Sequence, residues 1–216
     1  MHLNSTLSKN ILAWYDNSKR NLPWRVSKKS PNKLYYRLLS EFMLQQKQVK
    51  TVIPYFNKFI KKYKSIESFS KINEKQILKL WEGLGYYRRA RNLLASANIL
   101  VKEHKSKLPK TLNEIKKLPG VGDYTANALL GLIHNQPTIA VDGNVKRVFS
   151  RYLNKNETKI NFEKVISFNK RKLFSTNRNS DFVEALMEFG ALICKPKDTK
   201  CFNCCLNKSC RYLKSS

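Results

Sequence analysis

Five cysteines lie close together near the end of the chain, and four of them could serve one metal site. Cys194, Cys201, Cys204 and Cys210 have the spacing C-x6-C-x2-C-x5-C. Thiolates are soft ligands that hold zinc or iron–sulfur clusters, and the spacing leaves both open. Structural zinc sites usually contain two C-x2-C pairs, however, and only one is present. The adjacent Cys205 is expected to point elsewhere, although a ligand set that uses Cys205 instead stays open.

Two carboxylates stand in different surroundings. Glu41 is flanked by apolar residues on both sides, which would raise the pKa of its carboxyl group and keep it protonated for donation to a substrate. A solvated helix-surface position is the alternative. Asp142 precedes Gly143, Asn144 and an expected helix, so it is a good N-cap. Two carboxylates in unlike environments can divide acid and charge-stabilising work, as they do in glycoside hydrolysis.

A possible phosphate-binding turn lies between two helical segments. Gly120, Val121 and Gly122 form a G-x-G turn, where glycines allow tight turning and close approach to a ligand. The N–H groups at the start of the following helix can bind a phosphate. An ordinary connection between helices is the alternative for this turn when it is considered alone.

The charge favours a nucleic-acid partner. The chain has 42 Lys and Arg residues against 15 Asp and Glu, a net charge of +27, and such a field attracts nucleic acid first and anionic membrane second. Part of the lysine excess is compositional background. No apolar run reaches the roughly 20 residues of a membrane span, and the first residues lack a signal-peptide pattern. We therefore expect an intracellular protein with no membrane partner.

These residues must be positioned by helices. Apolar periodicity predicts a helix over residues 74–81 and another over residues 90–104. Capping boxes predict helix starts at Thr111–Glu114 and at Asp181–Glu184. The only β-like run is Thr138–Val141. The chain is therefore predicted to be all-α.

The order of these motifs resembles the endonuclease III superfamily of helix-hairpin-helix DNA glycosylases, and within it the A/G-specific adenine glycosylases (MutY family). Besides the cysteines and the hairpin, four segments carry the resemblance: residues 22–25 (LPWR), 40–49 (SEFMLQQKQV), 81–93 (WEGLGYYRRARNL) and 141–148 (VDGNVKRV). The resemblance implies a two-module fold with duplex DNA in the groove between the modules. One module spans residues 25–135, with the hairpin at about 111–135; the other joins residues 1–24 to 136–216. It also implies a [4Fe–4S] cluster on the four cysteines.

The resemblance assigns roles to individual residues. Glu41 would protonate adenine at N7, and Asp142 would face the sugar C1′ with Asn144 holding it in place. Relatives that also nick the strand have a lysine where this chain has Tyr124, and a phenol cannot form the required Schiff base. We therefore expect a monofunctional glycosylase that leaves an abasic site, with Tyr124 lining its pocket. A core aromatic is the alternative for Tyr124.

Further residues would contact DNA. By the same resemblance, Tyr86 would intercalate and Gln46 would contact the base opposite the target, with a packed aromatic as the alternative for Tyr86. Trp24 and Arg25 would line the base pocket. Residues expected to grip the DNA backbone are Gly120, Val121, Gly122, Lys146 and the cluster-loop lysines Lys195, Lys197 and Lys200, for which a solvated loop is the alternative.

The expected substrate is double-stranded DNA containing adenine mispaired with 8-oxoguanine or guanine. The expected enzyme is a monomer in the bacterial cytoplasm, associated with the nucleoid. Three features depart from the family pattern in the pocket and in the part expected to recognise 8-oxoguanine: Lys47 replaces a threonine, residues 34–39 lack the usual tryptophan, and the chain ends six residues after Cys210. A mismatch thymine or uracil glycosylase, and a DNA-binding module without catalysis, therefore stay as alternatives.

Overall fold

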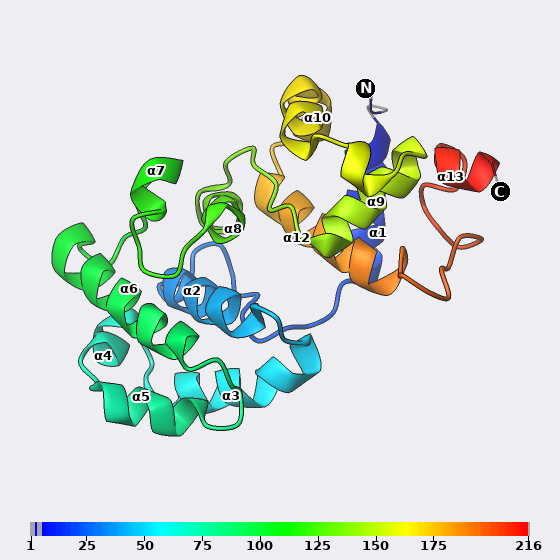
Figure 1. Cartoon of the computed structure of the whole chain (residues 1–216). Coiled ribbons are helices and arrows are strands. Elements are labelled where there is room, and N and C mark those ends of the chain that lie inside the picture. Colours follow the sequence, from blue (N-terminus) through cyan, green and yellow to red (C-terminus); the bar gives the residue numbers. More distant parts are fainter. Residues whose placement is uncertain (1–2, 4–5, 216) are drawn as a thin grey trace. The chain divides into compact units, whose positions relative to one another are not determined.

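Helices are the only regular secondary structure in the described part of this computed structural model, which comprises residue 3 and residues 6–215 (Figure 1). The predicted helices over residues 74–81 and 90–104 are confirmed as α5 and α6. The β-like run Thr138–Val141 is irregular chain, and no described segment pairs with it as a second strand, which agrees with the all-α prediction. The α-helices are α1 (Thr6–Ser18), α2 (Lys33–Leu44), α3 (Val49–Lys62), α4 (Ile66–Ser70), α5 (Glu74–Trp81), α6 (Arg88–His104), α7 (Leu112–Ile115), α8 (Asp123–His134), α9 (Gly143–Leu153), α10 (Phe162–Phe168), α11 (Lys170–Leu173), α12 (Asn179–Leu192) and α13 (Arg211–Lys214), with a 3₁₀ turn at Glu157–Lys159.

The chain divides into two compact units, each with its own apolar core. We call residues 21–133 the hairpin unit, and residues 1–20 together with 134–216 the cluster unit. The boundaries expected from the sequence, at 24/25 and 135/136, lie a few residues further along the chain. Because the cluster unit is discontinuous, its first helix packs against residues that come more than a hundred positions later in the chain.

In the hairpin unit, α6 is the central helix and packs against α2, α4 and α5 (Figure 1). Helix α3 packs against α2 and α5, and large aromatic side chains fill the core of the unit: Phe56 and Phe59 of α3 and Trp81 of α5 are fully buried. Trp24 joins this core, 4% exposed, with its ring edge-to-face against Phe56 at a centroid distance of 5.3 Å. The structure thus gives Trp24 a packing role, and its contact with a substrate base stays a prediction.

In the cluster unit, α12 packs against α1 and α9, and α9 packs against α13. A buried carboxylate fixes the end of α1: Glu188 accepts the Arg20 backbone N–H at 2.7 Å and pairs with the Arg20 guanidinium at 3.1 Å. Tyr15 donates a short hydrogen bond to Glu184, one turn earlier on α12. Burying such carboxylates is costly unless they are paired, so these contacts fix how α1 lies on α12.

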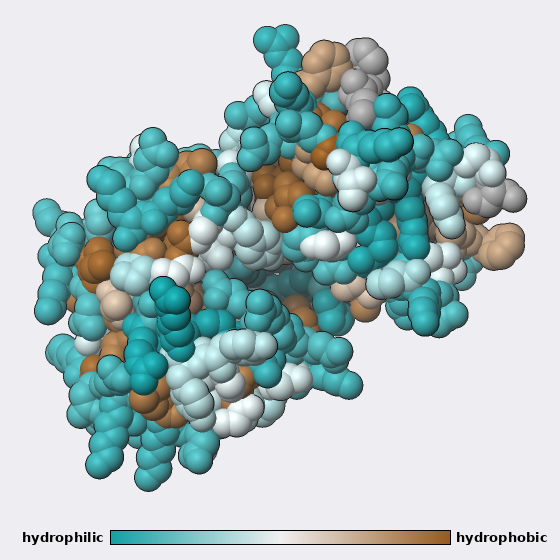
Figure 2. Space-filling model, viewed as in Figure 1, coloured by the Kyte–Doolittle hydropathy of each residue, from teal (hydrophilic) through white to brown (hydrophobic). Residues whose placement is uncertain are grey.

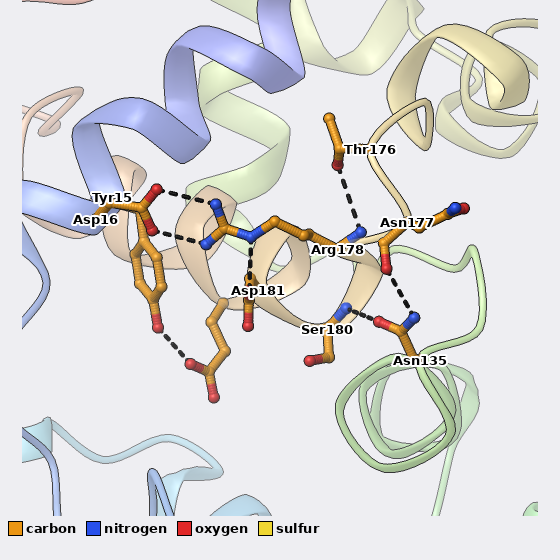
Figure 3. A network of polar contacts seen from close by, with 9 residues as sticks. Tyr15, Asp16, Asn135, Thr176, Asn177, Arg178, Ser180 and Asp181 are labelled. Atoms are coloured by element: carbon orange, nitrogen blue, oxygen red, sulfur yellow. Dashed lines mark hydrogen bonds and ion pairs between the residues drawn. The ribbon is translucent and has the colours of Figure 1, made fainter. Parts of the chain in front are cut away.

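The start of α12 differs from the prediction. The helix begins at Asn179, so Asp181 lies inside its first turn and is not the N-cap of a capping box. Its carboxylate instead accepts from Arg178 Nε at 2.9 Å, and Arg178 also binds both carboxylate oxygens of Asp16 at 2.9 and 2.6 Å (Figure 3). The hydrogen bond from Arg178 is the main cause that lowers the pKa of Asp16.

A side chain distant in sequence provides the helix cap that the sequence pattern did not. Asn135 Oδ1 accepts the Ser180 backbone N–H at 2.9 Å, and Asn135 Nδ2 donates to the Asn177 carbonyl at 2.9 Å (Figure 3). The first bond satisfies a backbone N–H that a helix start leaves open, and the second ties Asn135 to the segment before the helix. The prediction failed because the cap comes from a separate segment of the chain.

Hydrophilic residues cover most of the visible face of each unit (Figure 2). None of the helices in the described residues combines the length and apolar character that a membrane span requires.

Candidate functional site

Glu41 is buried on α2. It is 7% exposed, and its neighbours Leu38 and Phe42 are fully buried. The alternative of a solvated surface position is therefore wrong. A carboxyl group in such surroundings is suited to proton transfer, because burial disfavours its charged form.

The hairpin consists of the short helix α7, a turn and the longer helix α8. Thr111 caps α7 by accepting the Glu114 N–H at 3.3 Å, as the sequence predicts. Gly120 has a φ of +77°, and a Cβ at this position would lie 2.6 Å from Asn92 Nδ2. Only glycine fits this turn without strain or displacement of Asn92. Tyr124 lies half-buried in the first turn of α8.

Two residues of the hairpin unit are presented to solvent on left-handed backbone. Gln46 follows α2 with a φ of 58°, and Tyr86 precedes α6 with a φ of 53°. Tyr86 is 63% exposed and Gln46 is also exposed. The packed-aromatic alternative for Tyr86 is wrong, and both side chains are accessible to a partner.

Asp142 is the N-cap of α9, as its sequence context predicts. Its Oδ1 accepts the Val145 N–H at 2.7 Å, and its Oδ2 accepts from Asn144 Nδ2 at 3.0 Å. Each carboxylate oxygen therefore has a fixed donor, and the group stays half-exposed. A carboxylate held in this way can face a developing positive charge without reorganising.

Arg147 connects this cap to the rest of the cluster unit. Its guanidinium donates to Asn144 Oδ1 at 2.8 Å, to the Gly190 carbonyl at 2.7 Å and to the Cys194 carbonyl at 2.8 Å. No sequence motif gave Arg147 a role, although it lies one turn before Arg151, and the i,i+4 spacing puts both side chains on one face of α9.

Gly190 lets α9 and α12 approach closely beside this cap. A Cβ at Gly190 would lie 2.7 Å from Asn144 Cβ and 3.0 Å from its carbonyl oxygen. We expect Gly190→Ala to lower the free energy of unfolding by about 1–3 kcal/mol, because overpacking must push the two helices apart. Urea unfolding measures the loss.

The matched control for this prediction is Gly143→Ala. Gly143 is the first residue of α9, and a Cβ there meets nothing within 4 Å. We expect stability close to that of the unmodified protein. Equal losses in the two variants would contradict the steric explanation.

The four cysteines predicted as ligands all line one largely apolar cavity in the cluster unit. Its other walls include Val148, Arg151, Phe189, Ile193 and Leu206. Two donors point at the thiols: Leu206 N–H lies 3.4 Å from Cys204 Sγ, and Arg151 Nη1 lies 3.6 Å from Cys194 Sγ. Hydrogen bonds to sulfur are a feature of iron–sulfur sites, so this donor set fits a cluster. Within the described residues, no three ligating side chains are grouped so as to hold a single metal ion.

Cys205 does not line the cavity, as expected for a cysteine that points elsewhere. A hydrogen bond from the Cys205 thiol lowers the pKa of Cys204 to about 7, while the same bond raises the pKa of Cys205. Burial raises the pKa of Cys194. The neighbouring thiols Cys204 and Cys205 therefore differ: the one in the cavity ionises more easily.

Five other candidate residues have less direct placements. Arg25 is half-buried in the turn after Leu22. Lys146 lies 3.9 Å from Glu157 and 5.9 Å from the Phe162 ring centroid. Lys195 is half-buried, whereas Lys197 and Lys200 are exposed. Lys197 and Lys200 are thus the most accessible of these cations.

Comparison with known proteins gives a consistent result. Residues 39–170 match the HhH-GPD superfamily of base excision DNA repair proteins. The chain is 42% identical to an adenine DNA glycosylase of Buchnera aphidicola subsp. Baizongia pistaciae over 93% of its length and 56% of the relative's. It is 37% identical to the mouse adenine DNA glycosylase, over 94% of its own length and 41% of that protein. The chain thus spans about half the length of these relatives.

Solved structures agree on the fold. A thermostable thymine-DNA glycosylase superposes with a TM-score of 0.83 at 28% identity, covering 98% of this chain and 96% of the other. An endonuclease III–DNA covalent intermediate superposes with a TM-score of 0.74 at 22% identity, covering 99% of both chains. The second likeness concerns the fold alone.

Proposed function

Since the chain belongs to the HhH-GPD superfamily of base excision DNA repair proteins, we propose that it is a monofunctional DNA glycosylase that removes adenine mispaired with 8-oxoguanine or guanine. The observation that carries the proposal is the Asp142 carboxylate, held on both oxygens at the start of α9. The similarity to adenine DNA glycosylases indicates which base is removed.

Breaking an N-glycosidic bond requires a proton on the leaving base and stabilisation of positive charge on the sugar. Glu41, buried on α2, donates the proton to adenine N7. Asp142 faces C1′, and Asn144 fixes the orientation of its carboxylate through the 3.0 Å hydrogen bond. Water completes the hydrolysis and leaves an abasic site.

Strand cleavage by the enzyme itself is not part of this proposal. An amine is needed to form the Schiff base that leads to nicking, and position 124 carries a tyrosine. Tyr124 lines the pocket from the first turn of α8. The product strand should therefore break only when the abasic site is treated with alkali.

The target base must leave the duplex before it reacts, which costs a few kcal/mol. The exposed Tyr86 fills the space that the base leaves, and Gln46 contacts the opposite base. Trp24 and Arg25 border the flipped base. Backbone phosphates contact the hairpin turn at Gly120, Val121 and Gly122, as well as Lys146 and the cluster-loop lysines.

A second candidate is removal of thymine or uracil opposite guanine. It is favoured by the superposition on a thymine-DNA glycosylase over nearly the whole of both chains. Against it, the sequence identity is 28% there and 42% to an adenine DNA glycosylase. The substrate assay decides between these two activities.

The assay uses labelled duplexes with A opposite 8-oxoguanine, A opposite G, and T or U opposite G, each processed with and without hot alkali. Breakage at adenine only after alkali is the expected result. Breakage at T or U alone would establish the second candidate. Binding without breakage at any base would mean a DNA-binding module without catalysis.

We also propose that Cys194, Cys201, Cys204 and Cys210 hold a [4Fe–4S] cluster. When bound, the cluster crosslinks the four thiolates and so ties down the loop that carries Lys195, Lys197 and Lys200. The cavity and its N–H donors to sulfur support this assignment. Brown protein that retains iron after dialysis against chelator is expected; colourless protein containing zinc would refute it.

Adjacent cysteines allow a matched test of the ligand set. We expect Cys204→Ser to lose most of its iron and Cys205→Ser to keep it, because only Cys204 lines the cavity. Iron per chain and visible absorbance measure the difference. The reverse pattern would show that Cys205 is the ligand.

Finally, we propose that the enzyme acts as a monomer in the bacterial cytoplasm, bound to the nucleoid. The net charge of +27 supports a persistent electrostatic attraction to DNA.

A further inference from the structure

We propose that Arg89 is a positioning residue: its buried guanidinium holds the turns that present Gln46 and Tyr86 as one rigid unit. Both turns and Arg89 belong to the hairpin unit. That the turns then act on DNA rests on the proposed function, but the positioning itself is a property of the free protein.

One side of the Arg89 guanidinium faces the C-terminal end of α2. Nη1 lies 3.1 Å from the Phe42 carbonyl, 2.9 Å from that of Met43 and 2.7 Å from that of Gln45. The last carbonyls of a helix have no partner within the helix and carry partial negative charge. Arg89 therefore caps α2 immediately before Gln46.

The other side faces the turn that precedes α6. Nη2 donates to the Leu84 carbonyl at 3.3 Å and to the Gly85 carbonyl at 3.0 Å. The Trp81 indole also donates to the Gly85 carbonyl at 3.0 Å, so this carbonyl has two donors immediately before Tyr86. One side chain thus joins the two turns directly.

The Tyr86 ring is in contact with the same cation. The guanidinium carbon of Arg89 lies 5.5 Å from the Tyr86 ring centroid and 5.4 Å from that of Trp81. Cation–π attraction at these distances favours one orientation of the ring although Tyr86 is 63% exposed. Lys47 lies 5.8 Å from the same centroid on the side of the other turn.

The arrangement explains why arginine occupies a buried position. Arg89 is 8% exposed, and burial lowers its pKa. A lysine ammonium has three donors on one nitrogen and cannot reach two separate groups of carbonyls as a planar guanidinium does. The left-handed backbone at Gln46 and Tyr86 needs such support, because non-glycine residues adopt it at a cost.

Hydrogen exchange of the free protein tests the positioning without DNA. In Arg89→Met, and more mildly in Arg89→Lys, we expect amide exchange at Lys47 and Leu84 to speed up by about tenfold or more, since charged hydrogen bonds to both turns are lost. Lys102→Met, which removes an exposed cation near the other end of α6, should exchange as the wild type does. Unchanged exchange in both Arg89 variants would overturn the proposal. If Arg89→Met does not fold, Arg89→Lys decides the result.

A binding comparison then tests the consequence. We expect Arg89→Lys to reduce by about tenfold the preference for a duplex with 2-aminopurine opposite 8-oxoguanine over a matched duplex. The variant should also reduce the rise in 2-aminopurine fluorescence that reports unstacking of this base. A purely structural defect would weaken binding to both duplexes equally. Wild-type protein without any preference would count against the proposed glycosylase, and the exchange data would still decide the role of Arg89.

Discussion

Glu41→Gln is expected to slow adenine release by about 10²–10⁴-fold, the usual contribution of a general acid. The amide has nearly the shape of the carboxyl group but cannot donate the same proton to the base. Because Glu41 is buried on α2 and glutamine has nearly the same volume, the packing around this position should persist, so stability should not fall sharply. Single-turnover kinetics on a duplex with A opposite 8-oxoguanine measures the rate.

The control for Glu41→Gln is Glu103→Gln, which removes an exposed carboxylate from α6. Its single-turnover rate should match the wild type. DNA affinity of Glu41→Gln should also be preserved, which separates the chemical step from binding. Adenine release at the wild-type rate in Glu41→Gln would falsify the assignment of the acid.

Asp142→Asn is expected to lower the rate by about 10²–10³-fold, which is typical when one electrostatic group is removed from an active site. Asparagine caps helices as well as aspartate does, so the bond from Val145 N–H can persist and α9 can still begin at Gly143. The substitution therefore removes the charge with little effect on the fold. Thermal unfolding measured beside the kinetics checks this separation.

Asp142→Ala distinguishes the two roles of this carboxylate. It removes both charge and cap, so we expect a similar loss of rate together with about 1 kcal/mol of lost stability. If Asp142→Asn kept full activity, the residue would be a helix cap only, and the sugar would have to be stabilised by another group.

The sequence predicted best those features that depend on neighbouring residues. The N-cap at Asp142, the cap at Thr111 and the helix over residues 74–81 are local patterns, and the structure confirms all three. The burial of Glu41 also follows from its apolar neighbours. Each of these features can be predicted from residues within about two helical turns.

Features built from distant segments could not be predicted in this way. Asn135 caps α12 from more than forty residues away, and for that reason the predicted helix start at Asp181 was wrong. Arg147 and Arg89 bind backbone carbonyls, which every residue carries, so no side-chain pattern marks their partners. Only the fold shows which carbonyls come within their reach.

The discontinuous cluster unit has a consequence during synthesis on the ribosome. The apolar face of α1, with Leu7, Ile11 and Leu12, is buried in a unit completed by residues 134–216. α1 ends at Ser18 and its partner α12 at Leu192, a separation of 174 residues. At a synthesis rate of about 5–20 residues per second, α12 is complete roughly 9–35 s after α1, and the hairpin unit can already fold in that interval. The nascent chain therefore exposes the apolar face of α1 until α12 has been made.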